Sequence, residues 1–414
     1  MFDIIAEIVG TIRRNKMRTA LTGFAVAWGI FILIVLLGAG NGLIHAFEKN
    51  VSGESLNVVT VYPGSTTKPY EGLKEGRNIK LENSDLEVAK NSFPDNVEDV
   101  GAMLYQGGAT ISYGAEYVSE YLSGSYPNEE DVNGIIMTKG RFINDIDIRE
   151  RRKVVVISSH TEEVLFKGAD GIGNFVNIGD NAYKVVGIYK EERSNGNEGS
   201  YIPLTTMQLI YGKGNKFDRF YLTTKGLDTE EANDAFEVDL RSAIAGNHRF
   251  APDDDGAVWM WNRLSQYMQV SKGMNMLTVA IWIIGIFTLM SGIVGVSNIM
   301  LITVKERTRE FGIRKALGAK PRSILALVLS ESIAITTFFG YIGMVAGIGV
   351  TELANTILGD GAGAEGSTTF VDPTVDLSIA VEATLALIMA GTIAGFIPAR
   401  KAVKVRPIEA LRAD

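Results

Sequence analysis

The sequence predicts a membrane protein with four transmembrane α-helices and a large α+β extracytoplasmic domain inserted between helices 1 and 2. Three observations lead to this fold class. Four long stretches are nearly free of charge, residues 43–275 between the first two are polar and mixed in periodicity, and basic residues gather beside the apolar stretches. Hydrophobic residues make up 46% of the 414-residue chain, and the mean hydropathy of +0.13 suits such a mixture.

The apolar stretches are long enough to cross a bilayer. No charged residue occurs in 19–47, 273–304 or 332–351, and 377–399 contains only Glu382. A helix needs roughly 20 apolar residues to span the hydrocarbon core, and buried helices of soluble proteins rarely have such long runs. We therefore expect spans at 20–42, 277–303, 323–350 and 378–398. The first is too long for the apolar region of a cleaved signal peptide, so we expect it to be retained as an anchor.

Charge predicts the orientation of these spans. The segments 1–20, 304–322 and 400–414 carry a net charge of +10, whereas the remainder of the chain carries −18. Lys and Arg beside membrane spans mark the cytoplasmic face. Both termini and the loop 304–322 are therefore predicted to be cytoplasmic, with 43–275 and the loop 351–377 outside.

The remaining segments complete this plan. Residues 1–19 have apolar side chains at helical spacing followed by basic ones, which predicts an amphipathic helix at the inner membrane surface, and 399–414 form a cytoplasmic tail. The chain has no cysteine, so the outer domain must be stabilised by its core alone.

Within 43–275, strands and helices alternate. We expect a strand in "SLNVVTVYPG", a helix at 83–92 capped by Asn83 or Ser84, and paired strands around Gly107 and Gly108. "VVVISSH" predicts a buried strand followed by a helix with a serine cap, and 179–181 predicts a hairpin turn. "DTEEANDAFEVDLRSAIAGNH" is typical of a helix, and "AVWMWNRLSQ" is expected to be helical and to run into the second span.

No residue pattern for catalysis, cofactor binding or metal binding emerges. The three histidines are far apart, and the "PDDDG" segment has Leu264 where an EF-hand loop would need an acidic ligand. No G-x-x-x-x-G-K-[ST] motif occurs, so this chain is not expected to hydrolyse ATP through a P-loop.

The loop 304–322, "VKERTREFGIRKALGAKPR", has a more specific pattern. Glu310 and Arg314 lie four residues apart in the favourable order, Gly318 provides a helix stop, and Pro321 can begin the next helix. An ordinary positively charged loop needs neither a helix stop nor interleaved acids. We therefore expect a short cytoplasmic helix that docks another protein.

Small residues recur four positions apart in the last three spans, a spacing that lets helix backbones approach closely. The pairs are Ser291 with Gly295, Gly343 with Gly347, and Gly391 with Gly395. The spacing predicts helix packing but leaves open whether the partner helix belongs to this chain or to a second copy.

Several segments in succession resemble the MacB/FtsX-like family of ABC transporter permeases. They are "TIRRNKMRTALTGFAVAWGIF", "KGRFINDIDIRERRKVVVIS", "YIPLTTMQLIYG", "NIMLITVKERTREFGIRKALGAKPRSIL" and "PARKAVKVRPIEALR". The resemblance covers nearly the whole chain and implies a MacB-like core domain of two α+β subdomains at 43–275. It also implies that eight residues form or shape the contact with an ATPase: Glu306, Arg307, Glu310, Phe311, Gly312, Arg314, Lys315 and Gly318.

The same resemblance implies a transporter permease of the bacterial inner membrane and not an enzyme. Such permeases form homodimers, or pair with a related permease, and work with cytoplasmic ABC ATPase subunits that bind ATP and Mg. MacB carries its ATPase domain fused at the N-terminus, whereas this chain begins at the amphipathic helix, so the resemblance implies a separate ATPase. A periplasmic adaptor is a further candidate partner, and nucleic acid is not one.

Three functions remain open within this family. The first is ATP-driven export of a periplasmic substrate such as an antimicrobial compound or a peptide, and the size of the outer domain favours it. The second is FtsX-like mechanotransmission that regulates a periplasmic hydrolase. The third is lipoprotein release.

Overall fold

The computed structural model describes residues 16–51, 55–190, 199–358 and 371–404. Most of the predicted amphipathic segment, the centre of the loop 351–377 and most of the tail 399–414 lie outside these residues. The chain divides into two compact units, one made of Met1–Asn50 and Gly273–Asp414 and the other of Val51–Lys272.

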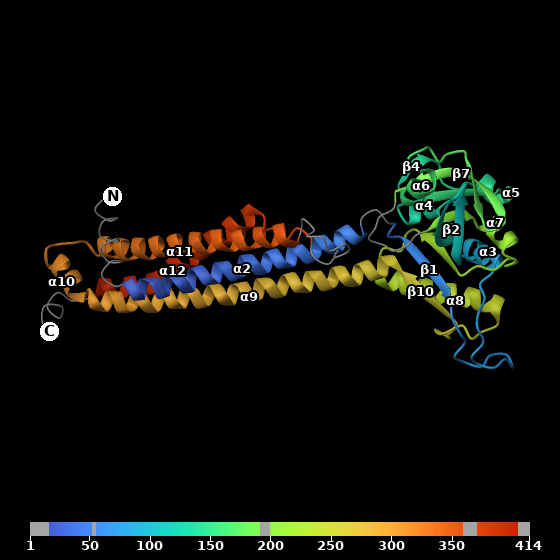
Figure 1. Cartoon of the computed structure of the whole chain (residues 1–414). Helices are drawn as coiled ribbons and strands as arrows, with labels where there is room; N and C mark the ends of the chain where they lie inside the picture. Colours follow the sequence, from blue (N-terminus) through green and yellow to red (C-terminus); the bar gives the residue numbers. More distant parts are fainter. Residues whose placement is uncertain (1–15, 52–54, 191–198, 359–370, 405–414) are drawn as a thin grey trace. The chain divides into compact units, whose positions relative to one another are not determined.

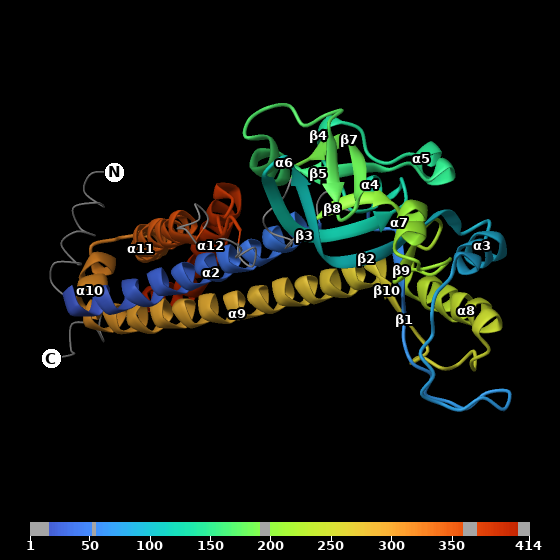
Figure 2. The ribbon, with the colours of Figure 1, turned by 45° about the vertical axis from the view of Figure 1, so that its right-hand side comes forward.

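Among the described residues of the first unit, four helices are long and apolar enough to cross a membrane. They lie side by side in Figures 1 and 2, and the short helix α10 connects the ends of two of them. Each is longer than the expected span, so the helices continue past the uncharged stretches. The bounds are α2 Lys16–Val51, α9 Arg263–Glu306, α10 Thr308–Ala316, α11 Pro321–Leu358 and α12 Leu377–Lys404.

Helix α2 provides much of the buried surface of this bundle. Val26, Ile30 and Ile34 are almost completely buried and form one apolar cluster with side chains of α9, α11 and α12. Large apolar side chains such as Trp282 and Phe287 point outward from α9. Apolar side chains both inside and outside are typical of helices surrounded by lipid.

The second unit contains a mixed sheet of ten strands. Its strand order is β10-β1-β9-β2-β3-β8-β5-β7-β4, and β6 pairs with β2 and β7. The strands are β1 Val58–Pro63, β2 Val97–Tyr113, β3 Glu116–Ser125, β4 Met137–Gly140, β5 Val154–Ser158, β6 Phe175–Ile178, β7 Asn181–Tyr189, β8 Ser200–Pro203, β9 Arg219–Thr224 and β10 Val258–Asn262.

The long strand β2 belongs to both halves of this sheet. Its first half pairs with β9, and its second half pairs with β3. The register shifts between Gln106 and Ala109, so Gly107 and Gly108 form an irregularity inside β2. The expectation of two strands paired around these glycines was wrong about the turn, since the chain reverses between Tyr113 and Glu116.

Six helices of the described residues pack around the sheet: α3 Asn83–Ser92, α4 Glu129–Val132, α5 Asp145–Glu150, α6 Ser159–Phe166, α7 Leu204–Ile210 and α8 Glu230–His248. Ser158 caps α6, as expected, by accepting a hydrogen bond from the Thr161 amide at 3.1 Å. The expected cap of α3 was wrong, because the capping position is Glu82, whose amide donates to the Asp85 carboxylate.

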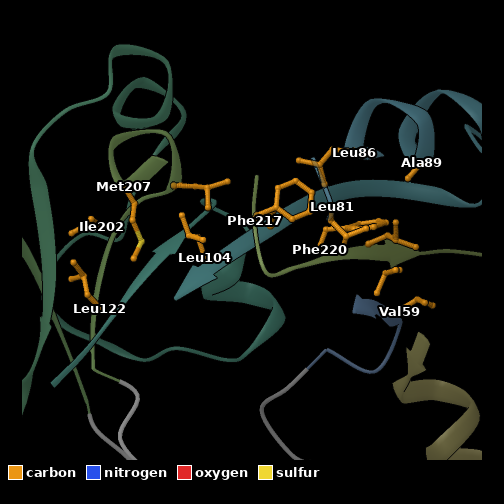
Figure 3. Packing of buried hydrophobic residues seen from close by; sticks show 14 of the residues in the cluster. Val59, Leu81, Leu86, Ala89, Leu104, Leu122, Ile202, Met207, Phe217 and Phe220 are labelled. Atoms are coloured by element: carbon orange, nitrogen blue, oxygen red, sulfur yellow. The ribbon is translucent and has the colours of Figure 1, made fainter. Parts of the chain in front are cut away.

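The core of the second unit lies between the sheet and these helices. Leu81, Phe217 and Phe220 pack against α3, while Leu104, Leu122 and Met207 form the neighbouring part of the same cluster (Figure 3). The side chains are bulky and most are less than a tenth exposed. This continuous core explains how the domain can be stable without disulfides.

The segment "VWMWN" is strand β10 and not the helix that we expected. Val258, Met260 and Asn262 are buried, whereas Trp259 and Trp261 are exposed. Burial with a period of two is the signature of a strand with one face on a core. Helix α9 begins only at the following residue, Arg263.

Candidate functional site

The loop 304–322 contains the short helix α10, and local backbone features determine where this helix begins and ends. Helix α9 stops at Glu306, and Arg307 leaves helical geometry with ψ of 11° before α10 begins. After Ala316, Gly318 adopts a φ of +91° that glycine tolerates best. The Gly318 amide donates to Lys315 O at 3.1 Å and the Ala319 amide to Arg314 O at 3.0 Å, the pairing of a Schellman motif.

One face of α10 packs against the helix bundle. Phe311 is only 1% exposed and packs in the apolar cluster that contains Val304 of α9 and Ile324 and Val328 of α11. Gly312 is buried beside it. Fully burying an aromatic side chain of this size contributes about 3 kcal/mol. The ring therefore fixes α10 against the neighbouring helices.

The guanidinium of Arg307 joins three helices. Its Nε and Nη2 donate to the two carboxylate oxygens of Glu310 on α10 at 2.9 and 3.0 Å. Its Nη1 donates to Glu331 Oε2 on α11 at 3.2 Å. The same guanidinium lies 5.3 Å from the centre of the Phe311 ring. A planar fork with several donors suits such a junction, which a lysine could not reproduce.

Two further bonds hold the rest of α10. Arg314 pairs with Glu310 Oε1 at 2.9 Å, one turn along the helix. The hydrogen bonds from Arg307, with the added charge of Arg314, lower the pKa of Glu310, so this carboxyl stays ionised. Lys315 Nζ donates to the carbonyl oxygen of Val403 on α12 at 2.9 Å.

The opposite face of α10 is exposed and carries Arg309 and Ile313, which we did not single out from the sequence. Leu317 is 84% exposed and Ile313 is 42% exposed, and Arg309 one turn earlier is also exposed. These three residues are spaced four apart and form one stripe, which we call the outer stripe of α10. Glu306 is exposed just before this helix.

The eight residues predicted to form or shape a contact thus divide into groups. Phe311 and Gly312 are buried, and Arg307 and Lys315 are tied to α11 and α12, so these four hold α10 in place. Glu310 and Arg314 are partly exposed and paired with each other. Gly318 ends the helix, and Glu306 lies on the surface.

The predicted packing residues lie mostly at contacts within the chain. A Cβ on Gly343 would lie 2.3 Å from Ala27 O of α2, and one on Gly347 would lie 2.9 Å from Ile34 Cβ. Gly391 and Gly395 approach Thr336 and Ser332 of α11.

The pair Ser291 and Gly295 on α9 is packed less tightly. Ser291 is exposed, and the neighbouring Gly292 is buried against Ala25 and Val26 of α2. A Cβ on Gly295 would only touch Ala25 Cβ, at 3.9 Å. The buried stripe of α9 therefore passes through Gly292 and not through Ser291.

The second unit has a junction of its own where the chain passes into α9. Arg263 Nη1 donates to the carbonyl oxygens of Val132 at 2.7 Å and Ser55 at 3.4 Å, and its Nη2 donates to Asn133 Oδ1 at 2.5 Å. The Ser55 amide also donates to Val132 O at 3.2 Å. Both ends of the unit are therefore bound to the C-terminal end of α4.

A buried carboxyl, that of Glu129, lies beside this junction. Glu129 is 1% exposed, and its Oε2 has no hydrogen-bond partner among the described residues, although Asn133 donates to its Oε1. Burial raises the pKa of Glu129, against the opposing effects of Tyr221, Arg219, Asn133 and Arg263.

We predict that Glu129→Gln makes the domain more stable at neutral pH, by on the order of 1 kcal/mol per unit of pKa shift. A raised folded-state pKa means that the carboxyl favours folding below its unfolded pKa and that this stability is lost as pH rises through the folded pKa. Thermal unfolding of the purified chain, measured from about pH 5 to about pH 8, should show the wild-type curve falling relative to the variant. Glu98→Gln, at an exposed carboxylate, is the control. Parallel curves for Glu129→Gln and wild type would refute the assignment.

Two family models match successive parts of the chain. The family model of the MacB-like periplasmic core domain matches residues 19–238, and that of the FtsX-like permease C-terminal region matches residues 282–407. The periplasmic region of MacB from Actinobacillus actinomycetemcomitans aligns with 54% of this chain and 96% of its own length, with a TM-score of 0.43 and 16% identity.

Curated relatives align over the whole chain. The macrolide export ATP-binding/permease protein MacB of Bdellovibrio bacteriovorus is 27% identical over 420 residues, covering 100% of this chain and 62% of the relative. The protein of the same name from Chlorobium luteolum is 29% identical over 426 residues, covering 99% and 60%. The chain thus spans about three fifths of the length of these relatives. With one family model matching more than half of the chain and the second matching its last three membrane helices, the chain belongs to the MacB/FtsX-like family of ABC transporter permeases.

Proposed function

We propose that this permease couples ATP hydrolysis by a cytoplasmic ABC ATPase to movement of its periplasmic domain, and that this movement expels a substrate from the periplasm. The ATPase is a separate subunit that binds ATP and Mg²⁺ and docks on α10. The substrate is an antimicrobial compound, a peptide or a molecule of similar size. The relatives named above are described as macrolide exporters, which supports the choice of an amphipathic small molecule as the first substrate to test.

One observation carries this proposal, namely that α10 is fixed on one face and open on the other. Phe311, Arg307 and Lys315 bind it to its neighbours, while the outer stripe of Arg309, Ile313 and Leu317 is exposed. Exposed aliphatic side chains next to charged ones are typical of a protein contact. A partner that moves α10 would also move α11 and α12, because their bonds to α10 are direct.

The second unit offers a matching feature. Arg263 is the first residue of α9, and it binds Ser55, which precedes β1, and the end of α4 through three hydrogen bonds. A displacement of α9 along its axis would therefore be passed to folded segments of the domain and would not be absorbed by a flexible linker. This supports transmission of movement in preference to a channel through the bilayer.

The proposed assembly contains two permease chains, either two copies of this chain or this chain with a related permease, and two ATPase subunits. A periplasmic adaptor completes it if the substrate must cross a second membrane. Both termini and α10 are assigned to the cytoplasm of a bacterium, on the basis of the basic residues beside the spans.

Leu317→Asp should abolish most ATPase binding. A contact that buries this leucine contributes about 2 kcal/mol, and an unpaired carboxylate there adds a penalty, so association should weaken on the order of a hundredfold. The test is affinity purification of the tagged permease from native membranes, with quantification of any ABC ATPase recovered as a second polypeptide. Leu377→Asp, the same substitution at an exposed residue that begins α12, should leave recovery unchanged.

Equal recovery with both variants would exclude docking on the outer stripe, and no ATPase with the wild-type chain would exclude a separate ATPase subunit. The other proteins recovered discriminate between functions. An adaptor supports export, whereas a periplasmic hydrolase supports the regulatory, FtsX-like function.

A further inference from the structure

Glu331 is an acidic side chain buried in a helix predicted to span the membrane. It lies three turns into α11, within the expected span 323–350, and only 4% of it is exposed. A carboxylate in such a position is costly unless it is paired. Its partner, Arg307, is 24 positions earlier in the chain and lies between α9 and α10. A bond between these two residues therefore connects the bundle to the base of α10.

The other contacts of Arg307 show that Glu331 does more than neutralise the charge of Arg307. Two of the Arg307 nitrogens are already bound to both carboxylate oxygens of Glu310, and the guanidinium lies over the Phe311 ring. Those contacts are local to α10 and would hold Arg307 to that helix without Glu331. What Glu331 adds is a directional bond from the same guanidinium to α11.

A hydrogen bond can fix the orientation of a helix, which apolar packing alone does not. Phe311 holds α10 close to the bundle, but a buried ring tolerates rotation and sliding of a nine-residue helix more easily than a hydrogen bond does. Lys315, two turns after Arg307, binds Val403 O of α12. With Arg307 bound to α11 at one end and Lys315 bound to α12 at the other, the axis of α10 is set at both ends.

We propose that Glu331 is a positioning residue that orients α10 through Arg307, so that the outer stripe meets its partner in one defined direction. The part of this proposal that concerns ATP turnover rests on the proposed function. The orientation of α10 is a property of the permease alone and can be measured without the ATPase.

The first experiment measures that orientation. The chain has no cysteine, so single cysteines can be introduced for spin labels without other changes. Labels at Ala316→Cys on α10 and Lys401→Cys on α12, both exposed positions, report the distance distribution between the helices by pulsed electron paramagnetic resonance. We expect Glu331→Gln to broaden this distribution and Glu331→Asp, which keeps the charge, to broaden it less. Glu382→Gln, at an exposed carboxylate on α12, should leave it unchanged.

The second experiment uses unlabelled permease assembled with the ATPase. Glu331→Gln should retain ATPase association within about threefold, because the outer stripe is intact, whereas permease-stimulated ATP turnover should fall about tenfold or more. If Glu331→Gln changes neither the stimulated ATP turnover nor the distance distribution, the proposal about Glu331 is overturned. In that case the proposed function still stands if the wild-type permease binds and stimulates the ATPase. Loss of folded protein in Glu331→Gln would also overturn it, because the carboxylate would then determine folding and not orientation. If wild-type permease binds no ATPase, the proposed function fails, and the distance measurement still decides the role of Glu331.

Discussion

Replacing Gly343 with leucine is expected to prevent the membrane helices from assembling, with loss of most of the folded protein. A Cβ at Gly343 would lie 2.3 Å from Ala27 O and 2.9 Å from Ala27 Cα, and these are backbone atoms of α2 that cannot move aside alone. The two helices would have to separate, and the contact of Gly347 with Ile34 one turn further would be lost as well. Helices in a membrane associate largely through such close packing, because lipid is as apolar as their side chains. We expect a destabilisation of about 3 kcal/mol or more.

The chain provides a matched control for this prediction. Gly349 is on the same helix and is exposed, and a Cβ there would have no neighbour within 4 Å. Gly349→Leu adds the same side chain to α11 and should leave folding intact. The measurement is the fraction of detergent-solubilised protein that stays monodisperse in size-exclusion chromatography after heating over a temperature series. Two superimposable melting curves would mean that α11 does not pack on α2 at Gly343.

The packing glycines illustrate how far a pattern in the sequence can be interpreted. The spacing of Gly343 and Gly347 predicts a close contact because two absent side chains on one helical face leave room for a backbone. It does not identify the partner, because any helix with a smooth face can fill that room. The structure assigns α2 to this pair and α11 to Gly391 and Gly395. Ser291 is exposed on α9, where the buried glycine is its neighbour Gly292, which no pattern of period four had marked.

The candidate site was predictable in outline for a similar reason. The Gly318 stop, the Pro321 start of α11 and the pairing of Glu310 with Arg314 are local features, and local features are encoded by neighbouring residues. The inward face of α10 is not local. Phe311 and Ile313 are both apolar, and only the surrounding α11 and α12 decide that the first is buried and the second exposed.

For strand β10, the local sequence suggested a helix and this prediction was wrong. We expected 257–262 to be helical and to run into the second span, as part of one long helix. Its alternation of burial, with Trp259 and Trp261 outward, is the pattern of a strand, and β1 provides the partner from about 200 residues earlier in the chain. Five residues are too few for periodicity to decide between the two structures.

Phe311→Ala should release α10 from the bundle, even though the Phe311 ring itself is hidden from any partner. Truncating a buried phenylalanine costs about 3 to 5 kcal/mol. The exposed population of α10 should therefore rise by about a hundredfold to several thousandfold. Trypsin can report this directly, because Arg309, Arg314 and Lys315 all lie within α10 and a seated helix is a poor substrate. Cleavage in this helix should accelerate by a similar factor in the permease alone.

Leu317→Ala is the informative counterpart, because Leu317 immediately follows α10 and is 84% exposed. It should leave the rate of tryptic cleavage within α10 unchanged and weaken ATPase recovery, since it removes part of the outer stripe without unseating the helix. Phe311→Ala should reduce both resistance to trypsin and ATPase recovery. If Phe311→Ala lowered ATPase recovery while cleavage stayed slow, the ring would have to act as a direct contact, and its burial in the bundle would not describe the working state. If Leu317→Ala accelerated cleavage as much as Phe311→Ala, the outer stripe would be part of the packing of α10 and could not be the docking surface.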